Sequence, residues 1–332
     1  MELTLLYIIV IFLLGYSTGV ISAFFGIGGG FIMTPALNVL GLPMTNAVAT
    51  GLSYTLITST LGGIKHFLAN NMIVKISLIV SVITIIGLRF SQIFVIYLDK
   101  LNIADFYIRL LYIVLLLSLG IIPLIKNNDE DDDNKNSFFA KIRELPPTIN
   151  LYDNNQSSIW IIIVIGLIVG FLQGFLGVGG GFVLVPLFIL ILNIPAHKAI
   201  GTSLLTIFIS SSFGSYYHII SGRVNLMVIL ILAIGTVLGV NFGSEAVKNI
   251  SENKFETFYS IFLTLAAFGI IFKQLGLETI SIIYTLTFVF LITIFILMKY
   301  YFQLKIPLID RIIELKSSKK NSSIKEIIKI NK

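Results

Sequence analysis

GYSTGVISAFFGIGGGFIMTP at residues 15–35 and GLIVGFLQGFLGVGGGFVLVP at residues 166–186 are two copies of one segment. The glycines, a phenylalanine and the final proline recur 151 positions apart. With one residue inserted the match continues 152 positions apart, through the pairs Thr50/Thr202 and His66/His218. A duplication whose copies each break an apolar stretch with glycines beside a proline is typical of secondary transporters.

The composition places this duplication in a membrane. The chain of 332 residues is 56% hydrophobic and 12% charged, with a mean hydropathy of +0.96. Apolar runs long enough to cross a bilayer as helices recur along the chain, about 9–11 in all. The sequence therefore predicts an all-α polytopic membrane protein, with two inverted structural repeats and glycine-broken helices.

The helices can be placed from these runs and the breaks between them. They are predicted at 3–25, 30–42, 46–68, 73–97 and 105–125, then at 159–176, 181–194, 197–220, 224–247 and 256–274, with an unpaired helix at 279–302. The segments 30–42 and 181–194 are short and each contains a proline. We expect them to be half-helices or re-entrant arms.

Five regions follow from this pattern. They are a first transmembrane repeat (1–125), a polar cytoplasmic linker (126–158), a second transmembrane repeat (159–275), an additional transmembrane helix (276–303) and a basic cytoplasmic tail (304–332). The acidic linker is read as a solvated loop in preference to a calcium site, because it lacks the glycine and distal glutamate of an EF-hand.

The basic tail sets the expected topology, since lysine and arginine gather on the cytoplasmic side. A nucleic-acid role for the tail is the less favoured reading. Counting back from the tail puts the linker inside and the Arg223 loop outside. If both short helices span, the copies are inverted and the N-terminus lies outside; if they only dip into the membrane, the parity changes.

Small residues spaced by four form a ridge in each repeat. They are Gly15, Gly19 and Ala23 in the first copy and Gly166, Gly170 and Gly174 in the second. This spacing places them on one helix face and lets another backbone approach closely, so the ridge is predicted to be a packing surface.

The glycine runs GIGGGF (26–31) and GVGGGF (177–182) are candidate substrate sites. A helix that restarts after such a run has amides without intrahelical partners and a positive dipole end, which attracts anions. A packing kink is the plainer alternative. The candidate substrate-binding glycines are Gly28, Gly29, Gly30, Gly179, Gly180 and Gly181.

Hydroxyl side chains cluster in the helix after each half-helix. The residues chosen as candidate substrate contacts are Thr50, Ser59, Thr202 and Ser211. Serine and threonine also bond their own helix backbone, so such residues can equally be inert.

Three basic or titratable residues are candidate proton or anion contacts: His66, His218 and Arg89. The histidines can also be interfacial residues with satisfied hydrogen bonds, and Arg89 can extend to the membrane surface. Deep within the predicted spans there is no carboxylate apart from Glu245 near a helix end. This argues against an acidic cation path.

The doubled glycine segment closely resembles the TauE/SafE family of sulfite and organosulfonate exporters. Ala47 to Thr50 with Ala199 to Thr202, the two histidine positions, and the turn Gly222-Arg223-Val224-Asn225 also carry the resemblance. It covers residues 7–125 and 160–275. The resemblance implies a role in moving small anions, mostly sulfur-containing ones, across the cytoplasmic membrane.

The sequence thus favours a multi-pass permease of the cell membrane that moves a small anion by alternating access, with a sulfur oxyanion or organosulfonate as the expected substrate. An anion channel or a non-transporting membrane scaffold is the alternative. No enzyme activity, catalytic residue, cofactor, metal site or nucleic-acid partner is expected. The expected partners are the anion and the lipid bilayer, while a coupling proton or sodium ion, a homodimer and the direction of transport stay open.

Overall fold

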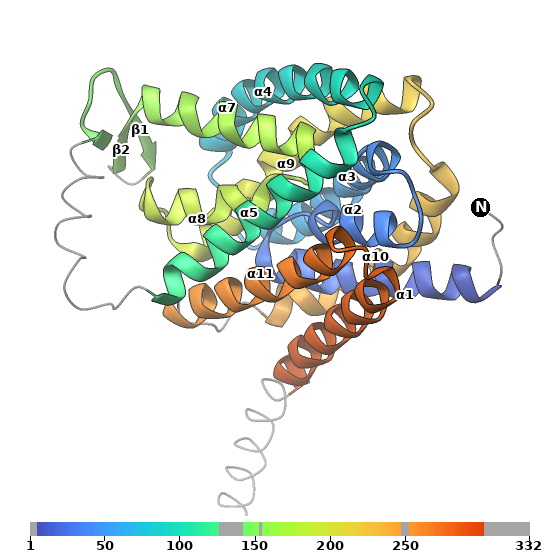
Figure 1. Cartoon of the computed structure of the whole chain (residues 1–332). Coiled ribbons are helices and arrows are strands. Elements are labelled where there is room, and N and C mark those ends of the chain that lie inside the picture. The colour runs from blue at the N-terminus through green and yellow to red at the C-terminus, as the bar shows by residue number, and fades with distance from the viewer. Residues whose placement is uncertain (1–4, 126–141, 153–154, 247–251, 302–332) are drawn as a thin grey trace, which may run out of the picture.

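A computed structural model describes residues 5–125, 142–152, 155–246 and 252–301, which fold almost entirely into helices (Figure 1). The first half contains α1 (Leu5–Phe25), α2 (Gly30–Val39), α3 (Met44–Leu68), α4 (Val74–Lys100) and α5 (Ala104–Ile125). A hairpin follows, made of β1 (Thr148–Tyr152) and β2 (Asn155–Ser158). The second half contains α7 (Ile159–Leu176), α8 (Gly181–Leu190), α9 (Ala196–Ile220), α10 (Leu226–Ala246) and α11 (Glu252–Gln274). A last helix, here called the C-terminal helix, spans Glu278–Tyr301.

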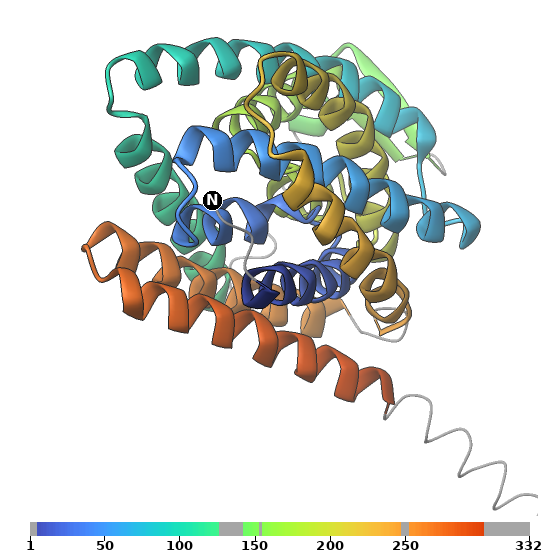
Figure 2. The ribbon, with the colours of Figure 1, turned by 90° about the vertical axis from the view of Figure 1, so that its right-hand side faces the viewer.

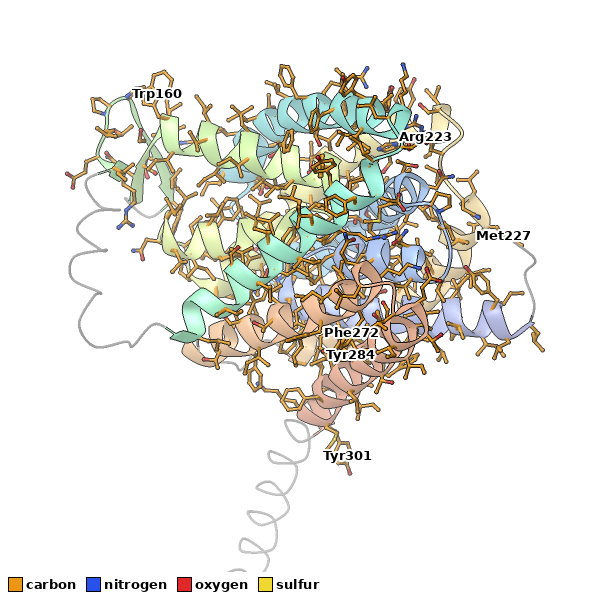
Figure 3. All side chains as sticks on the ribbon, in the orientation of Figure 1. Trp160, Arg223, Met227, Phe272, Tyr284 and Tyr301 are labelled. Atoms are coloured by element: carbon orange, nitrogen blue, oxygen red, sulfur yellow. The ribbon has the colours of Figure 1, made fainter. Side chains whose placement is uncertain are left out.

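Seven of the described helices are long and apolar enough to cross a bilayer. They are α1, α4, α5, α7, α10, α11 and the C-terminal helix. The prediction of an all-α, multi-pass membrane protein is confirmed. Figure 3 shows Trp160, at the start of α7, and Arg223, before α10, on opposite sides of the helical bundle.

Helices of one half pair with helices of the other. α1 packs along α10, and α4 packs along α7. In the first pair, Gly15 and Gly19 of α1 meet Leu232 and Thr236 of α10 in ascending order, so the two helices are parallel. The partners Gly166 and Gly170 of α7 meet Ile83 and Thr84 of α4 in the same way. The two counterpart helices α3 and α9 pack on each other, as do α5 and α11 (Figure 2).

The predicted packing ridge lies at these pairings. A Cβ atom added to Gly15 would lie 2.3 Å from the Leu232 carbonyl oxygen, and one added to Gly170 would lie 2.1 Å from the Thr84 carbonyl oxygen. Any side chain there would separate the helices. On the opposing helix α10, Gly239 and Gly243 allow the same close approach to Tyr16 and Val20.

The two half-helices end earlier than the sequence predicts. α2 stops at Val39 and α8 at Leu190, whereas the predictions ran to 42 and 194. In the first half Gly41 takes φ +100° and the Leu42 amide donates back to the Leu37 carbonyl. In the second half Asn193 takes φ +53° and the Leu192 amide donates back to Leu187. A left-handed residue after the last turn closes each helix.

The linker was predicted to be a loop throughout, and this is wrong for its last part. Residues 148–158 form the antiparallel hairpin of β1 and β2. TINLY alternates polar and apolar residues with the period of a strand, and the apolar Leu151 is buried. The Lys75 ammonium donates a hydrogen bond to the Asn150 carbonyl, which fixes the hairpin to the start of α4. The linker's acidic run, 129–133, lies outside the described residues, as does the basic tail from 302 onward.

Candidate functional site

The two glycine breaks lie against each other at the centre of the fold. The first glycine break is residues 26–29, between α1 and α2, and the second glycine break is residues 177–180, between α7 and α8. A Cβ atom added to Gly28 would lie 3.6 Å from the Gly179 Cα atom. One added to Gly30 would lie 2.7 Å from the Gly177 carbonyl oxygen, and one added to Gly181 would lie 2.5 Å from that of Gly26. The candidate glycines of both copies are therefore brought together.

Hydroxyl groups of α3 cover the amides of the first break. The Gly29 amide donates to Thr58 Oγ1 at 2.7 Å, and the Gly30 amide donates to Thr55 Oγ1 at 2.9 Å. The Thr55 hydroxyl in turn donates to the Gly51 carbonyl at 2.9 Å. The anion-attracting amides at the start of α2 are thus already bonded in this conformation.

Carbonyl groups of the breaks are bonded across the two halves. The Ser203 hydroxyl of α9 lies 3.0 Å from the Gly26 carbonyl oxygen and 2.8 Å from that of Ile200 in its own helix. Thr34 of α2 donates to the Gly177 carbonyl at 3.0 Å. Gly51 is the residue that corresponds to Ser203 in the first half, and it has no side chain to offer. The carbonyl of the second break is instead bonded by the Thr34 hydroxyl, which belongs to α2.

The second break has a different conformation and different neighbours. Its last residue, Gly180, has φ +71°, whereas the corresponding Gly29 is right-handed with φ −66°. Ile207 stands where the first half has Thr55. Ser210 corresponds to Thr58, but its hydroxyl donates to the side-chain oxygen of Gln173 at 2.8 Å.

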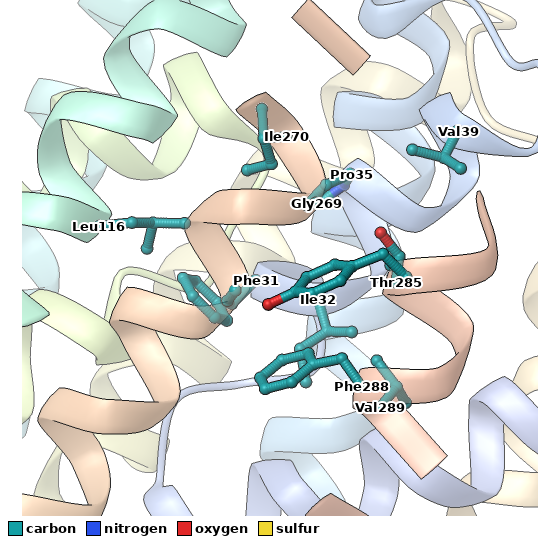
Figure 4. A pocket seen from close by; sticks show the side chains of 12 residues that line it. Phe31, Ile32, Pro35, Val39, Leu116, Gly269, Ile270, Thr285, Phe288 and Val289 are labelled. Carbon is teal, nitrogen blue, oxygen red and sulfur yellow. The ribbon is translucent and has the colours of Figure 1, made fainter. Parts of the chain in front are cut away.

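The half-helix prolines mark a further difference. A proline lacks the amide that would bond the carbonyl four residues earlier. In α8 the carbonyl affected by Pro186 is that of Phe182, and the Tyr259 hydroxyl donates to it at 2.7 Å. Apolar pockets lie beside both prolines. The one beside Pro35 of α2 is closed on one side by Tyr284 and Phe288 of the C-terminal helix (Figure 4), and the one beside Pro186 is lined by Phe255 and Tyr259 of α11.

Thr50 and Thr202 form a reciprocal pair of contacts between the halves. The Ile73 amide before α4 donates to Thr202 Oγ1 at 3.0 Å, and the Asn225 amide before α10 donates to Thr50 Oγ1 at 3.2 Å. In this conformation both hydroxyls hold the start of a helix from the other half.

Ser59 and Ser211 are buried and bond their own helices. The Ser59 hydroxyl donates to the Thr55 carbonyl at 2.7 Å, and the Ser211 hydroxyl donates to the Ile207 carbonyl. Neither hydroxyl contacts a glycine break in the described part of the chain. A role in binding substrate stays a prediction for all four candidate hydroxyls.

The candidate basic residues are not gathered at the breaks. His66 and His218 end the two antiparallel helices α3 and α9, so they lie toward opposite ends of the molecule. Both imidazoles are buried. Arg89 is exposed on α4 and its guanidinium lies 4.3 Å from the ring centre of Tyr217. Contact with an anion or a proton stays a prediction for these three.

Several residues that contact the breaks were not chosen as candidate substrate contacts, although Thr55, Thr58 and Ser203 belong to the predicted hydroxyl clusters. Thr55, Thr58, Ser203 and Thr34 bond them directly, and Gln173 lies beside the second. Thr55 and Thr58 are three apart, on one face of α3 together with Gly51 and Gly62. The two glycines mark the face of α3 that packs most closely, and this pattern in the sequence could have identified Thr55 and Thr58 as the residues that face the breaks.

Formal charge is missing from the walls of this site. The helices α1, α2, α7 and α8 contain no acidic or basic residue. Among the described residues no three histidine, cysteine, aspartate or glutamate side chains gather in a way that could hold a metal ion. Polarity at the breaks comes from backbone amides and carbonyls, from hydroxyls and from the Gln173 carboxamide.

Two paired helical halves, broken at the centre of a multi-pass bundle, define a polytopic membrane protein of the transporter class. The family model described as Sulfite exporter TauE/SafE matches residues 11–270. The chain belongs to the TauE/SafE family and is a membrane transporter.

Relatives of this chain extend over most of its length. A probable membrane transporter protein of Bacillus subtilis, YunE, is 28% identical over 80% of this chain and 97% of its own length. The probable membrane transporter protein MJ0441 of Methanocaldococcus jannaschii is 25% identical over 74% of this chain and 89% of its own. A sulfite exporter TauE/SafE family protein of Arabidopsis thaliana is 27% identical over 36% of this chain and 30% of its own. No solved structure matches the chain.

Proposed function

We propose that this protein is a permease for a small anion, that a sulfur oxyanion or an organosulfonate is its substrate, and that the substrate binds where the two glycine breaks meet. The observation that carries the proposal is the contact between the breaks. Each break begins a half-helix whose positive dipole end and first amides favour an anion. Because the surrounding helices carry no carboxylate, a negative substrate meets no like charge there.

The family supports the class of substrate. The matching family model is described as a sulfite exporter, and the relative from Arabidopsis has the same words in its name. We infer from this that a sulfur-containing anion is the expected cargo, and that it crosses the cytoplasmic membrane.

The transport step is proposed to be alternating access between two inverted repeats. The parallel pairs α1 with α10 and α4 with α7 support this arrangement, since each pair joins the first helix of one half to the fourth helix of the other. The Asp99 carboxylate at the end of α4 lies 4.0 Å from the Arg223 guanidinium before α10, a contact that is expected if these counterpart helices run in opposite directions. Rocking one half against the other would then open the breaks to each side in turn.

Thermal unfolding of the purified protein in the presence of anions tests the substrate class. Sulfite, thiosulfate, 2-hydroxyethanesulfonate and acetate are compared with neutral sugars, with and without sodium and across pH. A ligand that binds only the folded state raises the melting temperature, and the rise grows with the logarithm of its concentration relative to its Kd. Selective stabilisation by the sulfur anions is expected, and no stabilisation by any of them would contradict the proposal.

The position of the site is tested by Gly29→Val and Gly180→Val. Both variants are expected to insert into the membrane and to lose transport of the stabilising anion in proteoliposomes. Normal transport in both would place the substrate elsewhere.

The inverted arrangement has its own test. The chain has no cysteine, so single cysteines introduced at Leu5 and at Asn150 report their side of the membrane without background. Inverted repeats require that an impermeant thiol reagent labels Leu5→Cys from outside and Asn150→Cys only after permeabilisation. Labelling of both from the same side would exclude that arrangement.

A further inference from the structure

The second glycine break holds buried donors that the protein itself does not satisfy. Gly180 and Gly181 are buried, and across the described ranges neither amide donates a hydrogen bond. The first bonds of α8 run from the Val183 and Leu184 amides to the Gly180 carbonyl, which leaves the preceding amides outside the helix. A buried amide without an acceptor is costly, so such groups normally meet a water molecule or a ligand.

Gln173 supplies a second and independent set of donors at the same place. Its side chain is fully buried, its oxygen accepts the Ser210 hydroxyl at 2.8 Å, and its side-chain nitrogen has no partner among the described residues. A Cβ atom added to Gly180 would lie 3.8 Å from the Gln173 Cβ atom, so the Gln173 side chain starts beside the break. Because Ser210 bonds the oxygen, the NH2 group is the end left available.

The first break shows what the second lacks. There, Thr55 and Thr58 accept the Gly30 and Gly29 amides. In the second half Ile207 replaces Thr55 and cannot accept, while Ser210 is engaged by Gln173. Gln173 itself corresponds to Ser22, a much shorter side chain. The Gly29 and Gly30 amides are therefore bonded by the protein, whereas the Gly180 and Gly181 amides are not.

From this asymmetry we propose that the second glycine break is the anion-binding half of the site, with the Gly180 and Gly181 amides and the Gln173 carboxamide as donors and Ser210 as a positioning residue. This assignment rests on the proposed function as an anion permease. The donor set has N–H groups only, so it fits a group that accepts through several oxygens, such as a sulfonate or a sulfur oxyanion. The positive end of the α8 dipole adds to the attraction.

Gln173→Met tests the assignment, because methionine is close in volume and cannot donate a hydrogen bond. Gln92→Met on α4 is the matched control: Gln92 is also buried, but its side-chain nitrogen donates to the Gly214 carbonyl and not toward a break. Affinities for sulfite, thiosulfate and 2-hydroxyethanesulfonate are taken from the concentration dependence of thermal stabilisation. Gln173→Met is expected to weaken binding at least tenfold, since hydrogen bonds to charged groups are among the strong ones. Gln92→Met should stay within about twofold of the unchanged protein, because it removes no donor from the break.

Ser210→Ala gives a second reading that does not depend on Gln173→Met folding. Removing the Ser210 hydroxyl releases the carboxamide, so anion affinity should fall several-fold. Ser210→Thr, which keeps the hydroxyl, should restore it. A general loss of stability would lower the melting temperature without ligand and would not respond to the rescue.

The outcomes separate this inference from the proposed function. Unchanged anion affinity in Gln173→Met or in Ser210→Ala, with the original protein binding the probes, would overturn the assignment to the second break alone. If the original protein binds none of the probes, the anion permease itself is contradicted and this assignment falls with it.

Discussion

The two glycine breaks share the sequence pattern G-x-G-G-G-F, yet they differ in backbone conformation and in the hydrogen bonds of their amides. In the first break the Gly30 amide donates to Thr55 and the Gly29 amide donates to Thr58. The second has a left-handed Gly180, an apolar Ile207 facing it, and donors that remain available. The same motif is therefore hydrogen-bonded differently in the two halves, because α3 offers it threonine hydroxyls and α9 does not.

This difference is what alternating access between two repeats would require. If two inverted repeats had identical structures, a two-fold axis would relate them and the two sides of the membrane would be equivalent. Two copies of a sequence can adopt two conformations at once, and exchanging those conformations reverses the accessible side. The replacement of Thr55 by Ile207 makes the exchange unequal, because only the first break can satisfy both of its amides with threonine hydroxyls.

The largest effect is expected where the two breaks are alike, in their close packing. In Gly30→Ala the new Cβ atom would lie 2.2 Å from Thr55 Oγ1 and 2.7 Å from the Gly177 carbonyl oxygen. In Gly181→Ala it would lie 2.5 Å from the Gly26 carbonyl oxygen. Backbone atoms cannot move aside, so we expect each variant to lose about 3 kcal/mol of stability. Thermal unfolding in detergent measures the loss.

Gly63→Ala on α3 is the control for this prediction. Its added Cβ atom would meet only the end of Met72, at 3.7 Å, in a helix where alanine is favoured over glycine. Its melting temperature should be unchanged or slightly raised. If Gly30→Ala and Gly63→Ala melted together, the contact between the breaks would not be a feature of the folded protein.

The next effect is expected where the breaks differ. Thr55→Val leaves the Gly30 amide without its acceptor and should cost about 2 kcal/mol of stability. It should leave anion affinity unchanged, because this break is not the binding half. Ile207→Thr places a hydroxyl near Gly181 and should compete for that amide, which weakens anion binding roughly fivefold.

Thermal stabilisation by 2-hydroxyethanesulfonate, measured beside the ligand-free melting temperature, separates the two effects. The double variant Thr55→Val with Ile207→Thr exchanges the residues between the breaks. We expect it to combine both losses. An anion affinity that falls in Thr55→Val and not in Ile207→Thr would reverse the assignment of the two breaks.

The sequence predicted the helices well because their limits depend on local chemistry. Apolar runs, glycines and prolines place nearly every helix end within a few residues, and the duplication pointed to the breaks. The side chains that line the breaks depend on contacts distant in sequence. Thr34 bonds Gly177, 143 residues away, and only the rotation of α3 decides that Thr55 and Thr58, and not Thr50 and Ser59, face the glycines. The hairpin was missed because a charged linker obscured the short alternating segment TINLY.

The smallest effects are expected where the two halves are equivalent. Thr50→Val and Thr202→Val each remove one hydroxyl that accepts the amide at the start of α10 or α4. The two contacts are counterparts, so each variant should lose about 1 kcal/mol of stability, as for a helix cap, and the two losses should agree. Neither hydroxyl contacts a glycine break in this conformation, so anion affinity should be unchanged in both if the anion binds at the second break alone. A large loss of affinity with little loss of stability would instead return these threonines to the substrate path, and would mean that the conformation which binds the anion turns α3 and α9 to a different face.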